Sequence, residues 1–304
     1  LHTLYGITHN FSRYSCPRGF MLLGRAGEEA AFEADANTFK SPEISVEEAR
    51  AHVPILNDTI TRAAYHSGAL DIDTDRMIQD FAKTVRANGG QVLTGNAVTE
   101  ISFDKTWAVR CGNETLTADL LVNAAGAWAD QVAVLAGVMP VGITPLRRSM
   151  ARIPAPGGHD VSRWPIFFGV GETWYAKPDA GALLVSPADE DPVAPHDAWA
   201  DDMVLAEGLD RYASHVTEPV TRVETSWAGL RSFAPDRTLI VGQDPENENF
   251  IWCAGQGGYG FQTAPAASQL VADLTLGRPP EVDAATVKSL SPARFNTRYT
   301  MSLR

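Results

Sequence analysis

The sequence predicts an α/β protein built from two interleaved domains. Its 304 residues suit two domains at about 150 residues each. Apolar spacing indicates helices and strands over residues 66–140 and again after Trp227, whereas residues 147–216 contain short strands and turns rich in Pro and Gly. That middle pattern is typical of an antiparallel sheet. Because α/β segments flank an antiparallel insert, we expect residues 66–140 and 225–290 to form one domain, and residues 16–65 and 141–224 the other.

The first elements follow from local signals. Residues 20–23 are a short apolar run and predict a buried strand. Residues 45–53 predict a short helix, because Ser45 and Glu48 have the spacing of a capping box and Pro54 ends it. A longer helix is expected after Asp73, with apolar residues at helical spacing up to Gly89-Gly90.

Short strands are then expected at residues 91–93, 97–103, 107–111, 115–118 and 120–122, followed by a helix at 129–135. Near the end of the chain, residues 250–254 predict a buried strand. A glycine turn at 255–260 and a helix at 263–276 follow it.

Composition excludes several function classes. With 25 Lys and Arg against 37 Asp and Glu, the net charge of −12 argues against general nucleic-acid binding. No apolar run approaches the 18 or so residues of a membrane span, and the first residues lack the features of a signal peptide. Three widely spaced cysteines and seven scattered histidines predict neither a disulfide framework nor a metal site. We therefore expect a cytoplasmic enzyme.

Three motifs have simple alternatives. Residues 255–260 match G-x-G-x-x-G, but no second strand with an acidic residue follows, so a complete NAD-type half-domain is not expected. Asp71, Asp73 and Asp75 resemble the start of a calcium loop, yet the later loop positions do not match, and helix capping explains them better. Residues 189–191, Asp-Glu-Asp between two prolines, are expected to be a solvated loop.

Arginines mark both boundaries of the antiparallel insert. Arg147 and Arg148 lie at one boundary and Arg231 at the other. Guanidinium groups that arrive from both sides of a domain junction could bind a carboxylate bidentately. Surface ion pairs are the alternative, and composition alone favours them.

Five ordered motifs carry a family resemblance. They are DLLVNAAGAW at residues 119–128, PLRRS at 145–149, TWYAKPDAG at 173–181, SWAGLRSF at 226–233 and AGQGGYGFQT at 254–263. In this order and spacing the chain resembles the D-amino-acid oxidase superfamily of FAD-dependent oxidoreductases, and bacterial D-arginine dehydrogenase most closely. The resemblance extends from about residue 17 to residue 292.

The resemblance implies a glutathione-reductase-type FAD/NAD(P)-binding domain, residues 66–140 and 225–290, interleaved with an α+β substrate domain. It implies hydride transfer from the Cα of a D-amino acid to flavin N5, giving an imino acid that hydrolyses to a keto acid and ammonia. Arg148 and Arg231 match arginines that bind the substrate carboxylate. Tyr175 matches a tyrosine beside it, and Gly229 a glycine whose carbonyl accepts the substrate amine.

The cofactor implied is FAD, and the partners are an amino-acid substrate and an unidentified electron acceptor. The residues that match flavin contacts of the family are Val98, Ala125, Gly126, Trp128, Gly257, Gly258, Tyr259, Gly260, Phe261 and Gln262. Backbone N–H groups at the start of a helix would stabilise negative charge on the reduced ring. Because the flavin carries the redox step, the protein needs groups that orient the substrate and no nucleophile.

Two departures from the family pattern matter. The family begins with a strand, a G-x-G-x-x-G turn and a helix, about 70 residues that we expect to be missing here or supplied by a partner chain. A glutamate of D-arginine dehydrogenase is replaced by Phe20, so we expect neutral or apolar D-amino acids as substrates. Two alternatives stay open: an enzyme acting on glycine, sarcosine or a cyclic imino acid, and a non-catalytic remnant that does not hold FAD.

Overall fold

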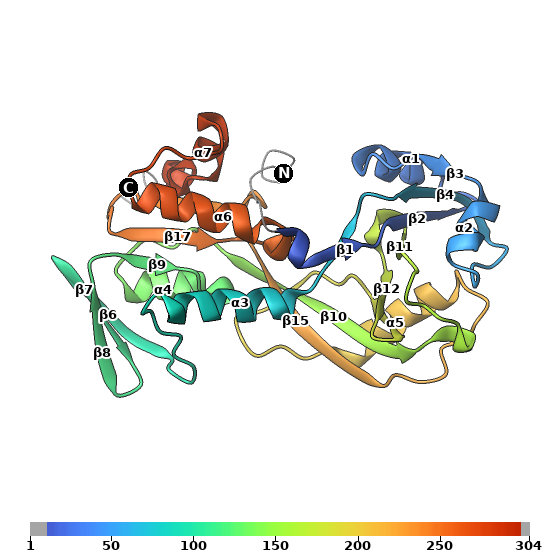
Figure 1. The fold of residues 1–304 in the computed structure, drawn as a ribbon, viewed down its shortest axis with the longest axis horizontal. Helices are drawn as coiled ribbons and strands as arrows, with labels where there is room; N and C mark the ends of the chain where they lie inside the picture. The colour runs from blue at the N-terminus through green and yellow to red at the C-terminus, as the bar shows by residue number, and fades with distance from the viewer. Residues whose placement is uncertain (1–10, 299–304) are drawn as a thin grey trace.

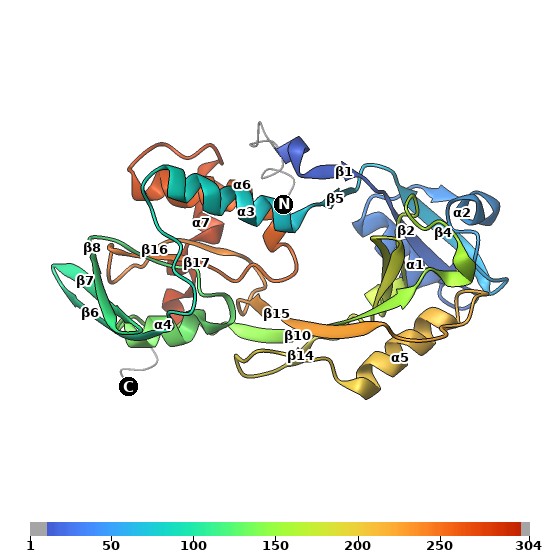
Figure 2. The ribbon, with the colours of Figure 1, turned by 60° about the horizontal axis from the view of Figure 1, so that its bottom comes forward.

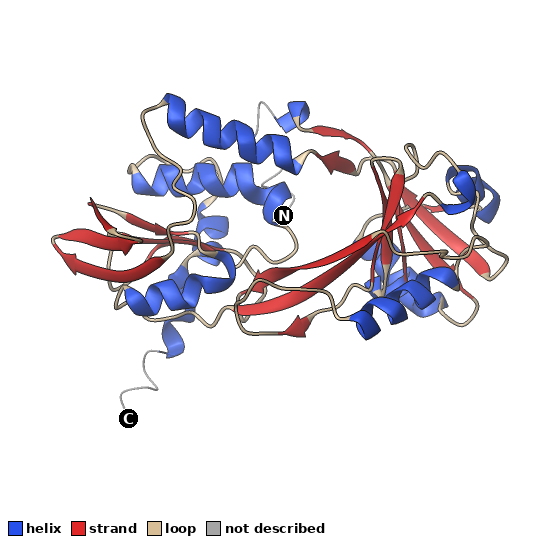
Figure 3. Cartoon of the chain, turned by 90° about the horizontal axis from the view of Figure 1, so that it is seen from below, coloured by secondary structure: helices blue, strands red, loops and turns tan. Residues whose placement is uncertain are grey.

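The computed structural model describes residues 11–298, which form two halves joined by two long strands (Figure 1). These strands, β10 (Thr144–Pro154) and β15 (Thr225–Phe233), pair antiparallel and run side by side between the halves (Figure 2 and Figure 3). Residues 1–10, on which the signal-peptide expectation rested, lie outside the described part of the chain. An α/β fold with mixed sheets confirms the predicted fold class.

A sheet of nine strands forms the first half, called here the large-sheet half. Its path is β14-β10-β13-β12-β11-β2-β4-β3, and β15 pairs with β10 beside that path. Apart from β10 and β15, its strands are β2 (Phe20–Arg25), β3 (Glu43–Ile44), β4 (Ile60–His66), β11 (Ile166–Gly169), β12 (Tyr175–Asp179), β13 (Ala182–Ser186) and β14 (Asp191–Pro192). All pairings are antiparallel except β11 with β2, so the antiparallel pattern predicted for residues 147–216 is confirmed.

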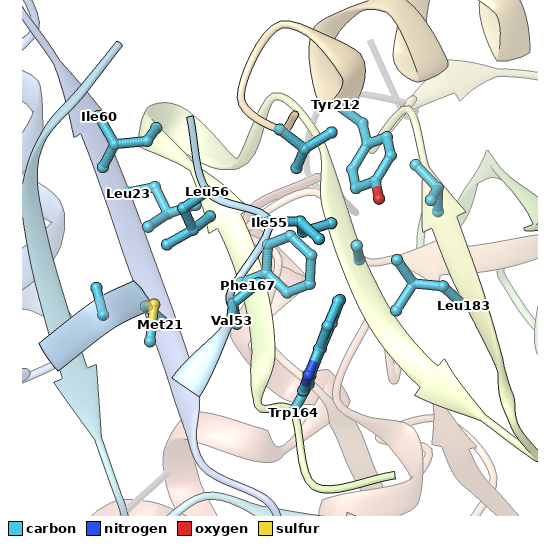
Figure 4. Packing of buried hydrophobic residues seen from close by; sticks show 14 of the residues in the cluster. Met21, Leu23, Val53, Ile55, Leu56, Ile60, Trp164, Phe167, Leu183 and Tyr212 are labelled. Carbon is cyan, nitrogen blue, oxygen red and sulfur yellow. The ribbon is translucent and has the colours of Figure 1, made fainter. Parts of the chain in front are cut away.

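The large-sheet half has a buried apolar core, and three helices pack with its sheet. They are α1 (Glu29–Thr38), α2 (Val46–His52) and α5 (Asp202–Ala213). The predicted capping box of Ser45 and Glu48 is present at α2. The sequence patterns did not predict α5, whose N-terminus is capped by the Asp201 carboxylate. In the core, Met21, Phe167 and Tyr212 are completely buried (Figure 4).

The second, small-sheet half contains two three-stranded sheets. One has the order β16-β17-β9, and the other is a meander, β6-β7-β8. Its strands are β6 (Val98–Asp104), β7 (Thr106–Cys111), β8 (Glu114–Ala118), β9 (Leu121–Asn123), β16 (Ile240–Gln243) and β17 (Phe250–Ala254). Its helices are α3 (Thr74–Ala87), α4 (Ala129–Leu135), α6 (Gly260–Thr275) and α7 (Ala284–Leu290). A short ladder of β1 (Ser15–Pro17) with β5 (Leu70–Ile72) precedes α3.

Most element predictions in this half are confirmed, and one is wrong. The helix at 129–135 and the strand at 250–254 have the expected bounds, and Asp73 caps α3 as predicted. The strand expected at 91–93 is absent, since these exposed residues lie in an irregular connection without a neighbouring strand. A β-strand is stabilised by hydrogen bonds to a neighbouring strand, and a segment without such a neighbour has no backbone partners that would hold it in strand conformation.

Part of the small-sheet half is uncovered. Within residues 11–298, β9 pairs with β17 on one edge only. The apolar face of α3 is exposed, with Ile78 at 50%, Phe81 at 43% and Val85 at 43% of their full accessibility. None of the helices in the described part of the chain has both the length and the apolar character that crossing a bilayer requires.

Candidate active site

A pocket of about 480 Å³ opens where the large sheet meets the turn before α6. It brings together five of the residues selected from the sequence, namely Arg148, Tyr175, Arg231, Gly258 and Tyr259. They come from β10, β12, β15 and the glycine turn, so segments more than a hundred residues apart meet here. The two arginines therefore face one cavity and not separate solvent regions.

Strand register brings the two arginines together. Arg148 pairs with Gly229 across the β10–β15 ladder, and Arg231 pairs with Leu146 two positions along. Residues two apart in a strand point to the same face, so both guanidinium groups lie on one side of the ladder. Burial lowers the pKa of Arg231, and the nearby charge of Arg148 lowers it further. A carboxylate between them would relieve this repulsion.

Arg148 carries an unsatisfied donor. The residue is only 9% exposed, and its Nη2 donates to Oε1 of Glu190 at 3.1 Å. Its Nε is buried and has no hydrogen-bond partner. Buried polar groups are nearly always paired, so an orphaned guanidinium N–H beside a cavity indicates a site for an anionic ligand.

The glycine turn packs directly against the end of β15. Gly257 has φ +53°, and a Cβ there would lie 2.4 Å from the Phe233 ring. A Cβ on Gly258 would lie 3.0 Å from Nη1 of Arg231. The turn leads into α6, a 16-residue helix whose first backbone N–H groups point out of its N-terminus. These features fit the flavin implied by the resemblance, because a flat ring can approach a backbone that has no side chains.

The other selected residues do not line this pocket. Gly229 lies on β15 and Gly257 on the glycine turn, whereas Gly260, Gln262 and the 46% exposed Phe261 lie in the first turn of α6.

Val98 and Trp128, 40% and 43% exposed, lie in the small-sheet half away from the pocket. Ala125 and Gly126 follow β9 in a turn that buried Asn123 shapes, since its Oδ1 accepts the Ala125 N–H at 3.3 Å.

The acidic turn, Asp189–Asp191, is only in part the solvated loop that the sequence predicts, because Glu190 and Asp191 are exposed whereas the Asp189 side chain is not. The carboxylate of Asp189 is nearly buried and accepts the N–H and the Oγ–H of Ser149, at 2.6 and 2.8 Å. Asp189 and Asp191 both pair with Arg147, at 3.3 and 2.7 Å. The pairing of β14 with β10 brings this turn onto the arginine strand. No local sequence signal shows such a contact.

One wall of the pocket is aromatic. Phe20, Phe39 and Phe168 pack against one another with ring centroids 5.5–5.8 Å apart. All three line the cavity, and Ile166 extends this apolar surface. The sequence pointed to Phe20 alone, because Phe39 and Phe168 have no motif around them. Glu172 and Lys177, also missed, complete the lining.

Comparisons with known proteins agree with this arrangement. The family profile described as DAO, FAD dependent oxidoreductase, matches residues 9–274. FAD-dependent oxidoreductase domain-containing protein 1 of Xenopus laevis is 26% identical over 184 residues, 53% of this chain and 36% of its own length. The uncharacterized oxidoreductase YurR of Bacillus subtilis is 24% identical over 250 residues, 79% of this chain and 64% of its own. The chain thus spans less than two thirds of these relatives.

Solved structures share the fold. Glycine oxidase from Geobacillus kaustophilus has a TM-score of 0.78 at 22% identity, over 92% of this chain and 75% of that one. L-proline dehydrogenase from P. horikoshii has a TM-score of 0.74 at 21% identity, over 96% of this chain and 79% of that one. The FAD-bound L-alpha-glycerophosphate oxidase from Mycoplasma pneumoniae has a TM-score of 0.79 at 20% identity, over 90% of this chain and 78% of that one. Because the family profile matches most of the chain, this protein belongs to the DAO family of FAD-dependent oxidoreductases.

Proposed function

We propose that this protein catalyses the FAD-dependent oxidative deamination of D-amino acids with neutral or apolar side chains. The observation that carries the proposal is a pocket with two convergent arginines, a glycine turn and an aromatic wall. The motifs of the chain resemble those of D-arginine dehydrogenase, which supports a D-amino acid as the substrate. Phe20, packed among other aromatic rings, favours an apolar substrate side chain over a guanidinium group.

Each residue has a positioning role in this proposal. Arg148 and Arg231 bind the substrate carboxylate, and Tyr175 lies beside it. The Gly229 carbonyl accepts a hydrogen bond from the substrate amine, which fixes the Cα–H direction. Bound FAD would supply the acceptor for the hydride that leaves Cα. Holding two ends of a small substrate can lower the barrier by several kcal/mol, so no acidic or basic side chain is needed for this step.

We assign residues 66–140 and 225–290 to the FAD-binding domain, and residues 16–65 and 141–224 to the substrate domain. Within the first of these, β15 (225–233) extends across to pair with β10 of the large sheet. The turn and the first residues of α6, 257–262, would face the flavin ring, with the N-terminus of α6 directed towards it. Val98, Ala125, Gly126 and Trp128 would contact the rest of the cofactor. Exposed apolar side chains such as Trp128 support this assignment, because a bound cofactor would cover them.

We propose further that additional polypeptide covers the free edge of β9 and the apolar face of α3. An open strand edge is seldom left to water, and the same holds for an exposed apolar helix face such as that of Ile78 and Phe81. Similar solved structures are longer, since the chain covers 75% of glycine oxidase. The mass of the native protein or complex tests this. We expect more than 32.8 kDa, and a native mass of 32.8 kDa with bound FAD would contradict it.

An oxidase of glycine, sarcosine or a cyclic imino acid is the second candidate. The fold likeness to glycine oxidase and L-proline dehydrogenase favours it, and an arginine pair suits any α-carboxylate. A substrate without a side chain, however, leaves the aromatic wall without a role.

Anaerobic reduction of the bound flavin by a substrate panel separates these candidates. We expect rapid bleaching by D-Leu and D-Phe, slow bleaching by D-Arg, and none by L-Leu or sarcosine. Arg231→Ala should keep the yellow colour and lower kcat/KM about 100-fold or more. Fastest reduction by glycine or sarcosine would favour the second candidate, and a colourless protein would favour the non-catalytic reading.

A further inference from the structure

Glu190 lies between two guanidinium groups. On one side its Oε1 accepts from Nη2 of Arg148 at 3.1 Å. On the other side both carboxylate oxygens accept from Nη2 of Arg237, at 3.1 and 3.0 Å. Arg237 lies outside every motif in the sequence, and its backbone has φ +58°, a conformation that costs free energy in a residue with a side chain.

The guanidinium group of Arg237 is also held by the aromatic ring of Phe233. Its guanidinium carbon lies 3.9 Å from the centroid of the Phe233 ring. That ring is the surface on which Gly257 packs, so one contact chain runs from the glycine turn through Phe233 and Arg237 to Glu190 and Arg148. This series of contacts connects the arginines on one side of the pocket with the glycine turn on the other side.

The two neighbouring arginines of β10 have different partners. Arg147 is paired with Asp189 and Asp191 on the opposite face of the strand. From the acidic turn, Arg148 pairs with Glu190 alone, and Glu190 also pairs with Arg237. Arg148 therefore keeps positive charge for a ligand in the pocket, while its buried Nε has no hydrogen-bond partner.

We propose that Glu190 and Arg237 are positioning residues that hold Arg148 ready for the substrate carboxylate. Glu190 fixes the orientation of the guanidinium group, and Arg237 offsets the negative charge of Glu190 that would otherwise weaken carboxylate binding. This inference rests on the proposed role of Arg148. It adds two residues that do not touch the substrate.

The test compares four variants of the FAD-loaded protein with wild type: Glu190→Ala, Glu190→Asp, Arg237→Gln and Arg237→Lys. The readouts are KM and kcat for D-Leu and the calorimetric Kd for phenylacetate, an apolar carboxylate that cannot be oxidised at an amine. We expect Glu190→Ala and Arg237→Gln to raise KM and Kd about five- to tenfold, with kcat within twofold. The conservative variants should recover at least half of this loss.

Asp191→Asn is the matched control, since Asp191 contacts Arg147 and not Arg148. Its KM and Kd should remain within twofold of wild type. Unchanged or lower KM and Kd in Glu190→Ala, or the same increase in Asp191→Asn, would overturn the inference while leaving the proposed function intact. A wild-type protein that neither binds phenylacetate nor oxidises D-Leu would overturn both.

Discussion

The two halves of the molecule differ in how completely they bury their own apolar residues. In the large-sheet half, Phe167, Trp174 and Tyr212 form one core without exposed surface. In the small-sheet half, Ile78, Phe81 and other apolar side chains are half exposed. The large-sheet half is closely packed around this core, whereas α3 of the small-sheet half leaves an apolar face exposed within the described residues. The pocket lies where the two meet.

The largest expected effect is on the free energy of unfolding, when one phenylalanine in each half is replaced by alanine. Phe167→Ala removes a buried ring and should cost about 3–5 kcal/mol of unfolding free energy. Phe81→Ala removes a ring that is 43% exposed and should cost less than about 1 kcal/mol. Urea unfolding followed by tryptophan fluorescence measures both. Equal losses would show that the face of α3 is covered in solution.

Two glycines at the border of the pocket, Gly257 and Gly229, give a second comparison. Gly257→Ala places a Cβ against Phe233 in a backbone with φ +53°, and should cost about 1–3 kcal/mol and lower FAD affinity. Gly229→Ala meets no atom within 4 Å and should change the unfolding free energy by less than about 0.5 kcal/mol. Thermal unfolding with and without FAD measures both. A more damaging Gly229 variant would contradict the packing described here.

A smaller effect concerns the connection between the halves. Asp71 on β5 pairs with Lys177 at 3.0 Å and with Arg18 at 3.1 Å. Although burial raises the pKa of Asp71, these two cations outweigh it and hold the pKa below its usual range. The pair therefore stabilises the fold above the unfolded-state pKa, and this contribution is lost as pH falls through the folded-state pKa.

Asp71→Asn should accordingly cost about 1 kcal/mol at pH 7, and the difference from wild type should shrink as the pH falls through the lowered folded-state pKa of Asp71. Asp73→Asn is the matched control, because Asn caps a helix as well as Asp does. Denaturant unfolding at several pH values provides the measurement. A difference that does not change with pH down to the acid limit of the folded state would mean that Asp71 acts through packing and not through its charge.

Local signals made much of this molecule predictable. The capping residues Ser45 and Asp73, the bounds of α4 and the strand before the glycine turn all follow from patterns within a few residues. The convergence of Arg148 and Arg231 was expected from family motifs, although composition favoured surface ion pairs. That alternative holds for Arg147, which pairs with the acidic turn.

What the sequence did not reveal depends on contacts between distant segments. Glu190 meets Arg148 across 42 residues, and Arg237 meets Glu190 across 47. Phe39 and Phe168 join Phe20 only after α1 and β11 pack beside β2. Tertiary pairing of this kind has no period or motif, so these contacts were missed, whereas Arg148 and Arg231 were predicted and line one pocket.

A crystal structure of the FAD-loaded protein with phenylacetate tests the central claim most directly. We predict that the carboxylate lies within hydrogen-bond distance of both Arg148 and Arg231, next to Gly258, with the phenyl ring against Phe20 and the other aromatic residues of the pocket wall. A carboxylate bound elsewhere, or in contact with neither arginine while FAD is in place, would contradict the proposed site.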